Sequence, residues 1–104
     1  MDISNKNNIN INGAKITVIG LGESGETAAL LGAHLGANIF MSDGGSTPDI
    51  LDRKKRLISQ GITIEIGGHT DKIYDADLWV LSPGIPQDAS MFLTAKEKSI
   101  KTKE

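Results

Sequence analysis

The sequence predicts an α/β fold in which a doubly wound parallel sheet of at least four strands lies between two layers of helices. Short apolar or β-branched runs alternate with longer segments of helical spacing, and most of the runs end at glycine or proline. A Gly-x-Gly-x-x-Gly motif also separates the first run from the first helical segment. Right-handed crossovers between such units place the strands in one sheet.

Each expected strand is short and stops at a turn signal. The strands are expected, in chain order, over residues 15–19, 38–42, 62–66 and 77–82, and the helices over 24–35, 48–60 and about 88–98. A fifth strand should follow the last helix, but only the polar residues 99–104 remain there. We therefore expect a fragment of a longer protein, although these residues could also add an edge strand in another register.

The second expected helix has the clearest start signal. The Thr47 hydroxyl can accept a free backbone N–H, and Pro48 suits the first helical position. The basic run 53–56 is expected on the solvated face. The apolar side chains expected to be buried are Ile50, Leu51, Leu57 and Ile58.

The 104 residues suffice for one domain, which we place at 13–104 after a flexible, Asn-rich leader over 1–12. The formal net charge of -2 disfavours a nucleic-acid or anionic-membrane partner. Apolar runs are too short to span a bilayer, and the leader lacks the apolar core of a signal peptide. A cytoplasmic location is expected, and the absence of cysteine fits a reducing compartment.

The glycine motif carries the main functional prediction. Gly20 allows a tight turn, Gly22 lets phosphate oxygens approach the backbone, and Gly25 lets the helix pack closely. The helix N-terminus adds free N–H groups with a partial positive charge. With a strand before it and a helix after it, the motif predicts a Rossmann-like site for phosphate or diphosphate, the alternative being a turn that needs glycine for packing alone.

Asp43 follows the second strand, where such folds place a carboxylate that accepts a hydrogen bond from a ribose hydroxyl or a base N–H. The alternative role is that of a turn former before Gly44 and Gly45. No Arg or Lys occurs between Asp43 and Arg53, which argues against a ribose 2′-phosphate and hence against NADP.

The fourth strand ends in Ser82-Pro83-Gly84-Ile85-Pro86. The carboxyl ends of parallel strands share one edge of the sheet, so this segment should face the same crevice as the glycine loop. The Gly84 N–H could donate to a second phosphate. Taken alone, such a segment is more often a plain proline-rich strand exit.

Three further residues are expected to have structural roles. His34 should face solvent, His69 should brace a turn, and Trp79 should lie in the core. Neither histidine has neighbours that suit metal ligation, so no metal site is predicted.

Several segments together resemble the N-terminal domain of MurD-type Mur ligases over about residues 13–100. They are, in order, the loop 20–25, Asp43, Gly68-His69, residues 77–86 with their Ser-Pro-Gly-Ile-Pro element, and 95–98. The resemblance implies a domain that binds the UDP part of UDP-N-acetylmuramoyl-L-alanine for a ligase of peptidoglycan biosynthesis that adds D-glutamate at the expense of ATP.

The resemblance also implies roles for individual residues. The backbone of Glu23 and Ser24 would meet the diphosphate, Asp43 with Gly44 would meet the uracil, and 82–84 would close on the diphosphate. The candidate substrate-binding residues are thus Gly22, Glu23, Ser24, Gly25, Asp43, Gly44, Ser82, Pro83 and Gly84. Family members often have a hydroxyl or basic side chain just after the uracil-binding acid, whereas Gly44 and Gly45 stand here.

No Gly-Lys-Thr/Ser loop occurs in the sequence, so we predict no cofactor, no catalytic residue and no turnover for this chain alone. The resemblance assigns ATP, Mg²⁺ and the reaction to the remaining ligase domains, which are expected partners together with the UDP-sugar substrate. One alternative is an NAD-binding Rossmann module of an oxidoreductase or regulatory sensor. Another is an interaction domain that kept the fold and lost its ligand.

Overall fold

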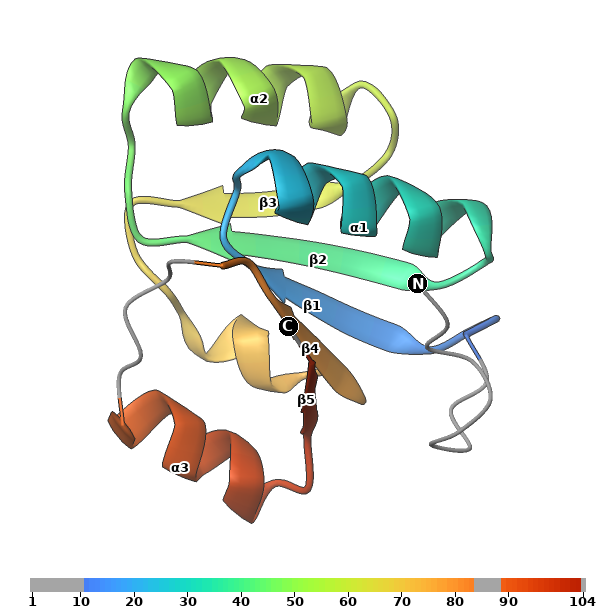
Figure 1. Ribbon diagram of the computed structural model, residues 1–104, viewed down its shortest axis with the longest axis vertical. Helices are drawn as coiled ribbons and strands as arrows, with labels where there is room; N and C mark the ends of the chain where they lie inside the picture. Colours follow the sequence, from blue (N-terminus) through green and yellow to red (C-terminus); the bar gives the residue numbers. More distant parts are fainter. Residues whose placement is uncertain (1–10, 84–88, 104) are drawn as a thin grey trace.

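Residues 11–83 and 89–103 are described by the computed structural model, and they form a five-stranded sheet with helices on both faces (Figure 1). The strands are β1 Lys15–Ile19, β2 Asn38–Asp43, β3 Thr63–Ile66, β4 Leu78–Leu81 and β5 Lys101–Lys103. Their order across the sheet is β3-β2-β1-β4-β5, and each neighbouring pair is parallel. The predicted doubly wound α/β fold is confirmed.

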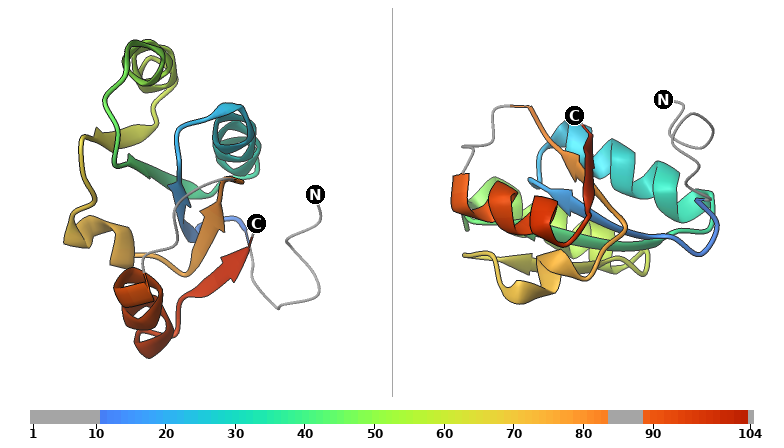
Figure 2. Two further views of the ribbon diagram at one scale, coloured as in Figure 1. Left: turned by 60° about the vertical axis from the view of Figure 1, so that its left-hand side comes forward. Right: turned by 90° about the horizontal axis from the view of Figure 1, so that it is seen from below.

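The helices are α1 Glu23–His34, α2 Pro48–Ile58 and α3 Ala89–Glu97, with a short 3-10 helix, η1 Asp71–Tyr74, before β4. Figures 1 and 2 show α1 and α2 on one face of the sheet and η1 and α3 on the other, which gives the three predicted layers. The start of α2 is as predicted, because the Thr47 hydroxyl accepts the Ile50 N–H at 3.4 Å. None of the helices in the described ranges is long and apolar enough to cross a membrane.

Each face of the sheet covers its own cluster of buried side chains. Beneath α1 and α2 the cluster is aliphatic, and Val18, Met41 and Leu57 are fully buried in it. On the other face the cluster surrounds Trp79, whose ring lies 5.6 Å from that of Tyr74 and whose Nε1 donates to the Ile73 carbonyl at 2.7 Å. The predicted core position of Trp79 is confirmed.

The structure contains the fifth strand, which the sequence analysis left open. β5 runs parallel to β4, with Lys101 beside Leu78 and Lys103 beside Val80. Buried Ile100 leads the chain back from α3 to the sheet edge. Ladder hydrogen bonds use only backbone groups, so the polar side chains of residues 101–103 do not prevent the pairing.

The predicted buried face of α2 is partly wrong. Leu57 is fully buried and Ile50 packs against the same cluster, but Leu51 is 44% exposed and Ile58 is 48% exposed. Residues seven apart lie on one line along a helix, so Ile50 and Leu57 form one stripe and Leu51 and Ile58 form the next. Only the first stripe faces the sheet.

The first described residue lies in the core. Ile11, assigned above to the leader, is 4% exposed and belongs to the aliphatic cluster, and its carbonyl accepts the Ala14 N–H. Residues 1–10 lie outside the described residues, as do residues 84–88, which include the predicted site residue Gly84.

Candidate functional site

The glycine loop joins β1 to α1 at the carboxyl edge of the sheet. Gly20 has a φ of 107°, a conformation that favours glycine, and its N–H donates to the Ser42 carbonyl at 2.8 Å. Gly22 is the residue before α1 and, as a glycine, has no side chain to cap the helix. Among the described residues no side chain caps the first turn, so its N–H groups can donate to an external acceptor, as an anion site requires.

The glycines at 22 and 25 have different structural requirements. A Cβ atom at Gly25 would lie 2.1 Å from the Gly20 carbonyl oxygen and 2.9 Å from Ser82 Oγ, so the close packing predicted for Gly25 is present. A Cβ atom at Gly22 would meet no atom within 4 Å. A side chain at position 25 would overlap the loop, whereas the space beside Gly22 is free of the described residues.

Asp43 fastens the glycine loop to the end of β2. Its Oδ2 accepts the Leu21 N–H and its Oδ1 accepts the Gly45 N–H, each at 2.7 Å. The turn-forming role considered above is therefore real. Each carboxylate oxygen keeps a second lone pair, so contact with a ligand stays a prediction.

Ser82 fastens the end of β4 to the other side of the same loop. Its N–H donates to the Ile19 carbonyl at 3.0 Å, and its hydroxyl donates to the Gly20 carbonyl at 3.2 Å. The strand order places β2 on one side of β1 and β4 on the other. The glycine loop is thus hydrogen-bonded to residues at the ends of both neighbouring strands, β2 and β4.

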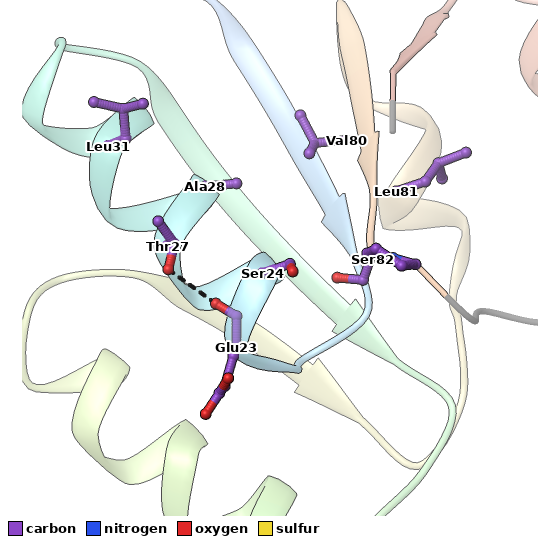
Figure 3. Close-up of a pocket in the computed structure, with 9 residues that line it drawn as sticks. Glu23, Ser24, Thr27, Ala28, Leu31, Val80, Leu81 and Ser82 are labelled. Carbon is purple, nitrogen blue, oxygen red and sulfur yellow. Dashed lines mark hydrogen bonds between the residues drawn. The ribbon is translucent and has the colours of Figure 1, made fainter. Parts of the chain in front are cut away.

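A cleft of about 530 Å³ opens between α1 and the end of β4 (Figure 3). Four predicted site residues line it, with Ser24 and Ser82 on facing sides. The lining residues are Glu23, Ser24, Thr27, Ala28, Leu31, Val80, Leu81, Ser82 and Pro83. Asp43 and Gly44 do not line this cleft; they lie at the carboxyl end of β2, which is on the opposite side of β1 from β4. The candidate site therefore has two parts, which the loop joins.

A polar cluster, which sequence reasoning mostly missed, lies at the ends of β2 and β3. Fully buried Ser42 donates its hydroxyl proton to Glu65 Oε2 at 2.6 Å, and Ser42 Oγ lies 2.7 Å from His69 Nδ1. Thr70 donates to both oxygens of Glu65, through its N–H at 2.9 Å and its hydroxyl at 2.6 Å. His69 follows the bend at residues 67–68, and its side chain contacts Ser42 of β2. The contact between Ser42 and Glu65 could have been predicted from the parallel pairing of β2 with β3, which places these two residues side by side.

The pKa of Glu65 reflects this cluster. Partial burial acts to raise the pKa of the carboxyl, but the hydrogen bonds from Ser42 and Thr70, with the nearby charge of His69, lower it below its ordinary value of 4.5. Glu65 is therefore a carboxylate at neutral pH, and it accepts hydrogen bonds without donating one.

Arg53 departs from the solvated face predicted for the basic run of α2. Its guanidinium donates to the Leu21 carbonyl at 3.4 Å, and Nε lies 3.0 Å from Glu26 Oε1, an ion-pair distance without hydrogen-bond geometry. The side chain is only 20% exposed. Such a contact between separate helices leaves no signal in local sequence. Within residues 11–83 and 89–103, no three side chains of the metal-ligating types gather into a site.

The sheet order reverses between β1 and β4, and the cleft lies at that switch point. Ligands of doubly wound folds bind there, outside the carboxyl ends of the strands. The sheet, the glycine loop and the cleft thus define a Rossmann-like domain of the class that includes nucleotide-binding proteins. The chain belongs to the MurD N-terminal domain family, whose family model matches residues 15–91.

Comparison with known proteins agrees with that membership. The chain is 40% identical over 92 residues to the UDP-N-acetylmuramoylalanine--D-glutamate ligase of Chlorobium chlorochromatii, covering 88% of this chain and 19% of the relative. It is 42% identical over 90 residues to the ligase of the same name from Christiangramia forsetii, covering 85% and 20%. The chain thus spans about a fifth of the length of these relatives.

Solved structures show the same fold. The A chain of dipicolinate synthase from Bacillus subtilis matches 88% of this chain and 37% of its own length, with a TM-score of 0.63 and 21% identity. At that identity the likeness extends to the Rossmann-like fold and no further.

Proposed function

We propose that this domain binds the UDP moiety of UDP-N-acetylmuramoyl-L-alanine in the cytoplasm, as the N-terminal domain of an ATP-dependent ligase that adds D-glutamate during peptidoglycan biosynthesis. The observation that carries the proposal is the cleft at the switch point, where the uncapped start of α1 faces Ser82. Relatives of 40% and 42% identity bear the name of that ligase.

The diphosphate fits the start of α1. The first-turn N–H groups of Glu23 and Ser24 offer donors and the positive end of the helix dipole. Ser24 and Ser82 add hydroxyls on the two sides of the cleft. The open space beside Gly22 lets phosphate oxygens come close to the backbone.

Acidic side chains near this loop are compatible with an anionic ligand. The carboxylate of Glu26, in the first turn of α1, is paired with Arg53 at 3.0 Å and with Arg56 at 3.2 Å. Glu23 is exposed and contributes through its backbone. The two arginines offset the repulsion that Glu26 would exert on a diphosphate.

The chemistry of ligation is assigned to the rest of the ligase. The 104 residues contain no Gly-Lys-Thr/Ser loop of the kind that holds ATP phosphates. ATP, Mg²⁺ and D-glutamate would bind to the remaining domains, and this chain alone would hold the UDP-sugar without turnover.

A calorimetric titration tests the proposal. The chain is titrated with UDP-N-acetylmuramoyl-L-alanine and, in parallel, with NAD, and its folding is checked by circular dichroism. Binding of the UDP-sugar without NAD is the expected result. Binding of NAD alone would replace the proposal with a dinucleotide domain, and no binding of either ligand by folded protein would contradict a UDP site in this chain.

A further inference from the structure

The cluster at the ends of β2 and β3 fixes the direction of its hydrogen bonds. Glu65 is a carboxylate with no proton to donate, so the 2.6 Å bond to Ser42 uses the single proton of the Ser42 hydroxyl. Ser42 is fully buried between paired strands and lies beside Glu65 in the register. Its oxygen can therefore only accept from a third partner.

That third partner is His69. Because Ser42 has already donated its proton, the 2.7 Å contact requires a proton on His69 Nδ1. A neutral imidazole that carries its proton on Nδ1 has a lone pair on Nε2. For the neutral ring, the hydrogen-bond network thus assigns the tautomer in which Nε2 is an acceptor.

His69 Nε2 faces the turn that follows Asp43. The atom lies 3.7 Å from the place where a Cβ at Gly44 would stand, and within the described residues it receives no hydrogen bond. Gly44 has no side chain to cover it. The neighbouring Asp43 already accepts one backbone N–H on each oxygen, which leaves His69 as the more open acceptor at this strand end.

Uracil offers the matching group. Its N3 carries a hydrogen, whereas N3 of cytosine carries a lone pair that would oppose the lone pair of Nε2. We infer that His69 Nε2 accepts the N3–H of the uracil ring and thereby selects uridine over cytidine nucleotides, an inference that rests on the proposed UDP site. Ser42 and Glu65 act as positioning residues, because they hold the imidazole through Nδ1.

The inference explains the glycine at position 44. Glycine carries only a hydrogen at this position. A base can therefore occupy the space beside His69 Nε2 that a side chain at position 44 would otherwise take. A larger residue there would project into that space.

The experiment measures UDP and CDP affinities by calorimetry for the wild type, His69→Phe and the control His34→Phe. His34 is an exposed histidine at the end of α1, far along the helix from the glycine loop. We expect the wild type to prefer UDP. His69→Phe should weaken UDP binding about five- to tenfold, the worth of one hydrogen bond, and leave CDP binding unchanged. His34→Phe should leave both affinities unchanged.

The outcomes distinguish a failure of this inference from a failure of the proposed UDP-binding function. Equal losses for UDP and CDP in His69→Phe, or an undiminished preference for UDP, would overturn the role of His69 while the UDP site stands. A folded wild type that binds neither nucleotide would overturn the proposed function and the inference with it.

Discussion

The two parts of the candidate site differ in what builds them. At the glycine loop, the groups offered to a ligand are mainly backbone N–H groups at the start of α1. At the ends of β2 and β3, side chains from Ser42, Glu65 and His69 hold one another at contacts of 2.6 and 2.7 Å. A backbone site depends on local geometry and on small residues, whereas a side-chain site depends on strands paired from distant parts of the chain. The two parts should therefore respond differently to substitution.

The largest effect is expected for Gly25→Ala. The new Cβ would lie 2.1 Å from the Gly20 carbonyl oxygen, a backbone atom that cannot move without displacing the loop. We expect a loss of about 3 kcal/mol or more in the free energy of unfolding, the upper end for overpacking. Denaturant unfolding followed by circular dichroism measures it. An unfolding midpoint equal to that of the wild type would show that the loop can shift to accommodate the added Cβ atom.

Gly22→Val is the matched change within the same loop. A Cβ atom at position 22 meets no atom of the described residues within 4 Å, and φ there is −103°, which any residue adopts. We expect a folded protein, with at most about 1 kcal/mol lost at the helix cap, that no longer binds the UDP-sugar because the branched side chain fills the phosphate path. Calorimetry checks binding. Retained affinity would show that the phosphate does not bind at this loop.

Asp43 lies between the glycine loop and the cluster at the ends of β2 and β3. The variant Asp43→Ala tests whether its carboxylate contributes to ligand binding. We expect UDP-sugar binding to weaken by about 1 to 3 kcal/mol, the worth of a hydrogen bond to a charged group. Asp43→Asn keeps an acceptor oxygen and separates loss of the loop contact to Leu21 from loss of charge. Unchanged affinity in the alanine variant would leave Asp43 with its turn-forming role alone.

Glu65→Gln should have the smallest effect, and it should depend on pH. The folded protein lowers the pKa of Glu65, so its stabilising contribution is present above the ordinary value of 4.5 and is lost as pH falls through the folded value. At pH 7 we expect the variant to be about 1 kcal/mol less stable than the wild type. The difference should narrow as pH falls below 4.5. Thermal unfolding across this range measures it, and a constant difference would contradict the cause given for the pKa.

Sequence reasoning succeeded where the structure is locally determined. The bounds of β1 and the Thr47 cap of α2 agree with the predictions, because residues close in sequence determine strand length and capping. The fifth strand was left open because residues 101–103 are polar and pair only through their backbone. The fold class needed only the spacing of apolar runs and glycines.

The candidate site divides in the same way. Glycine spacing predicted the loop, and the cleft gathers Glu23, Ser24, Ser82 and Pro83 as expected. The link from Arg53 to the Leu21 carbonyl joins residues 32 positions apart, and the Ser42 contact to His69 joins residues 27 apart. Such contacts arise from tertiary packing, which one sequence does not display.

Trp79 gives the molecule an optical reporter of its own folding. It is the only tryptophan of the sequence, it is fully buried in the cluster that η1 and α3 cover, and its indole N–H donates to the Ile73 carbonyl. Exposure to water on unfolding should shift its fluorescence to longer wavelength. Because the ring is not among the residues that line the cleft, its emission should report the integrity of the sheet independently of nucleotide occupancy.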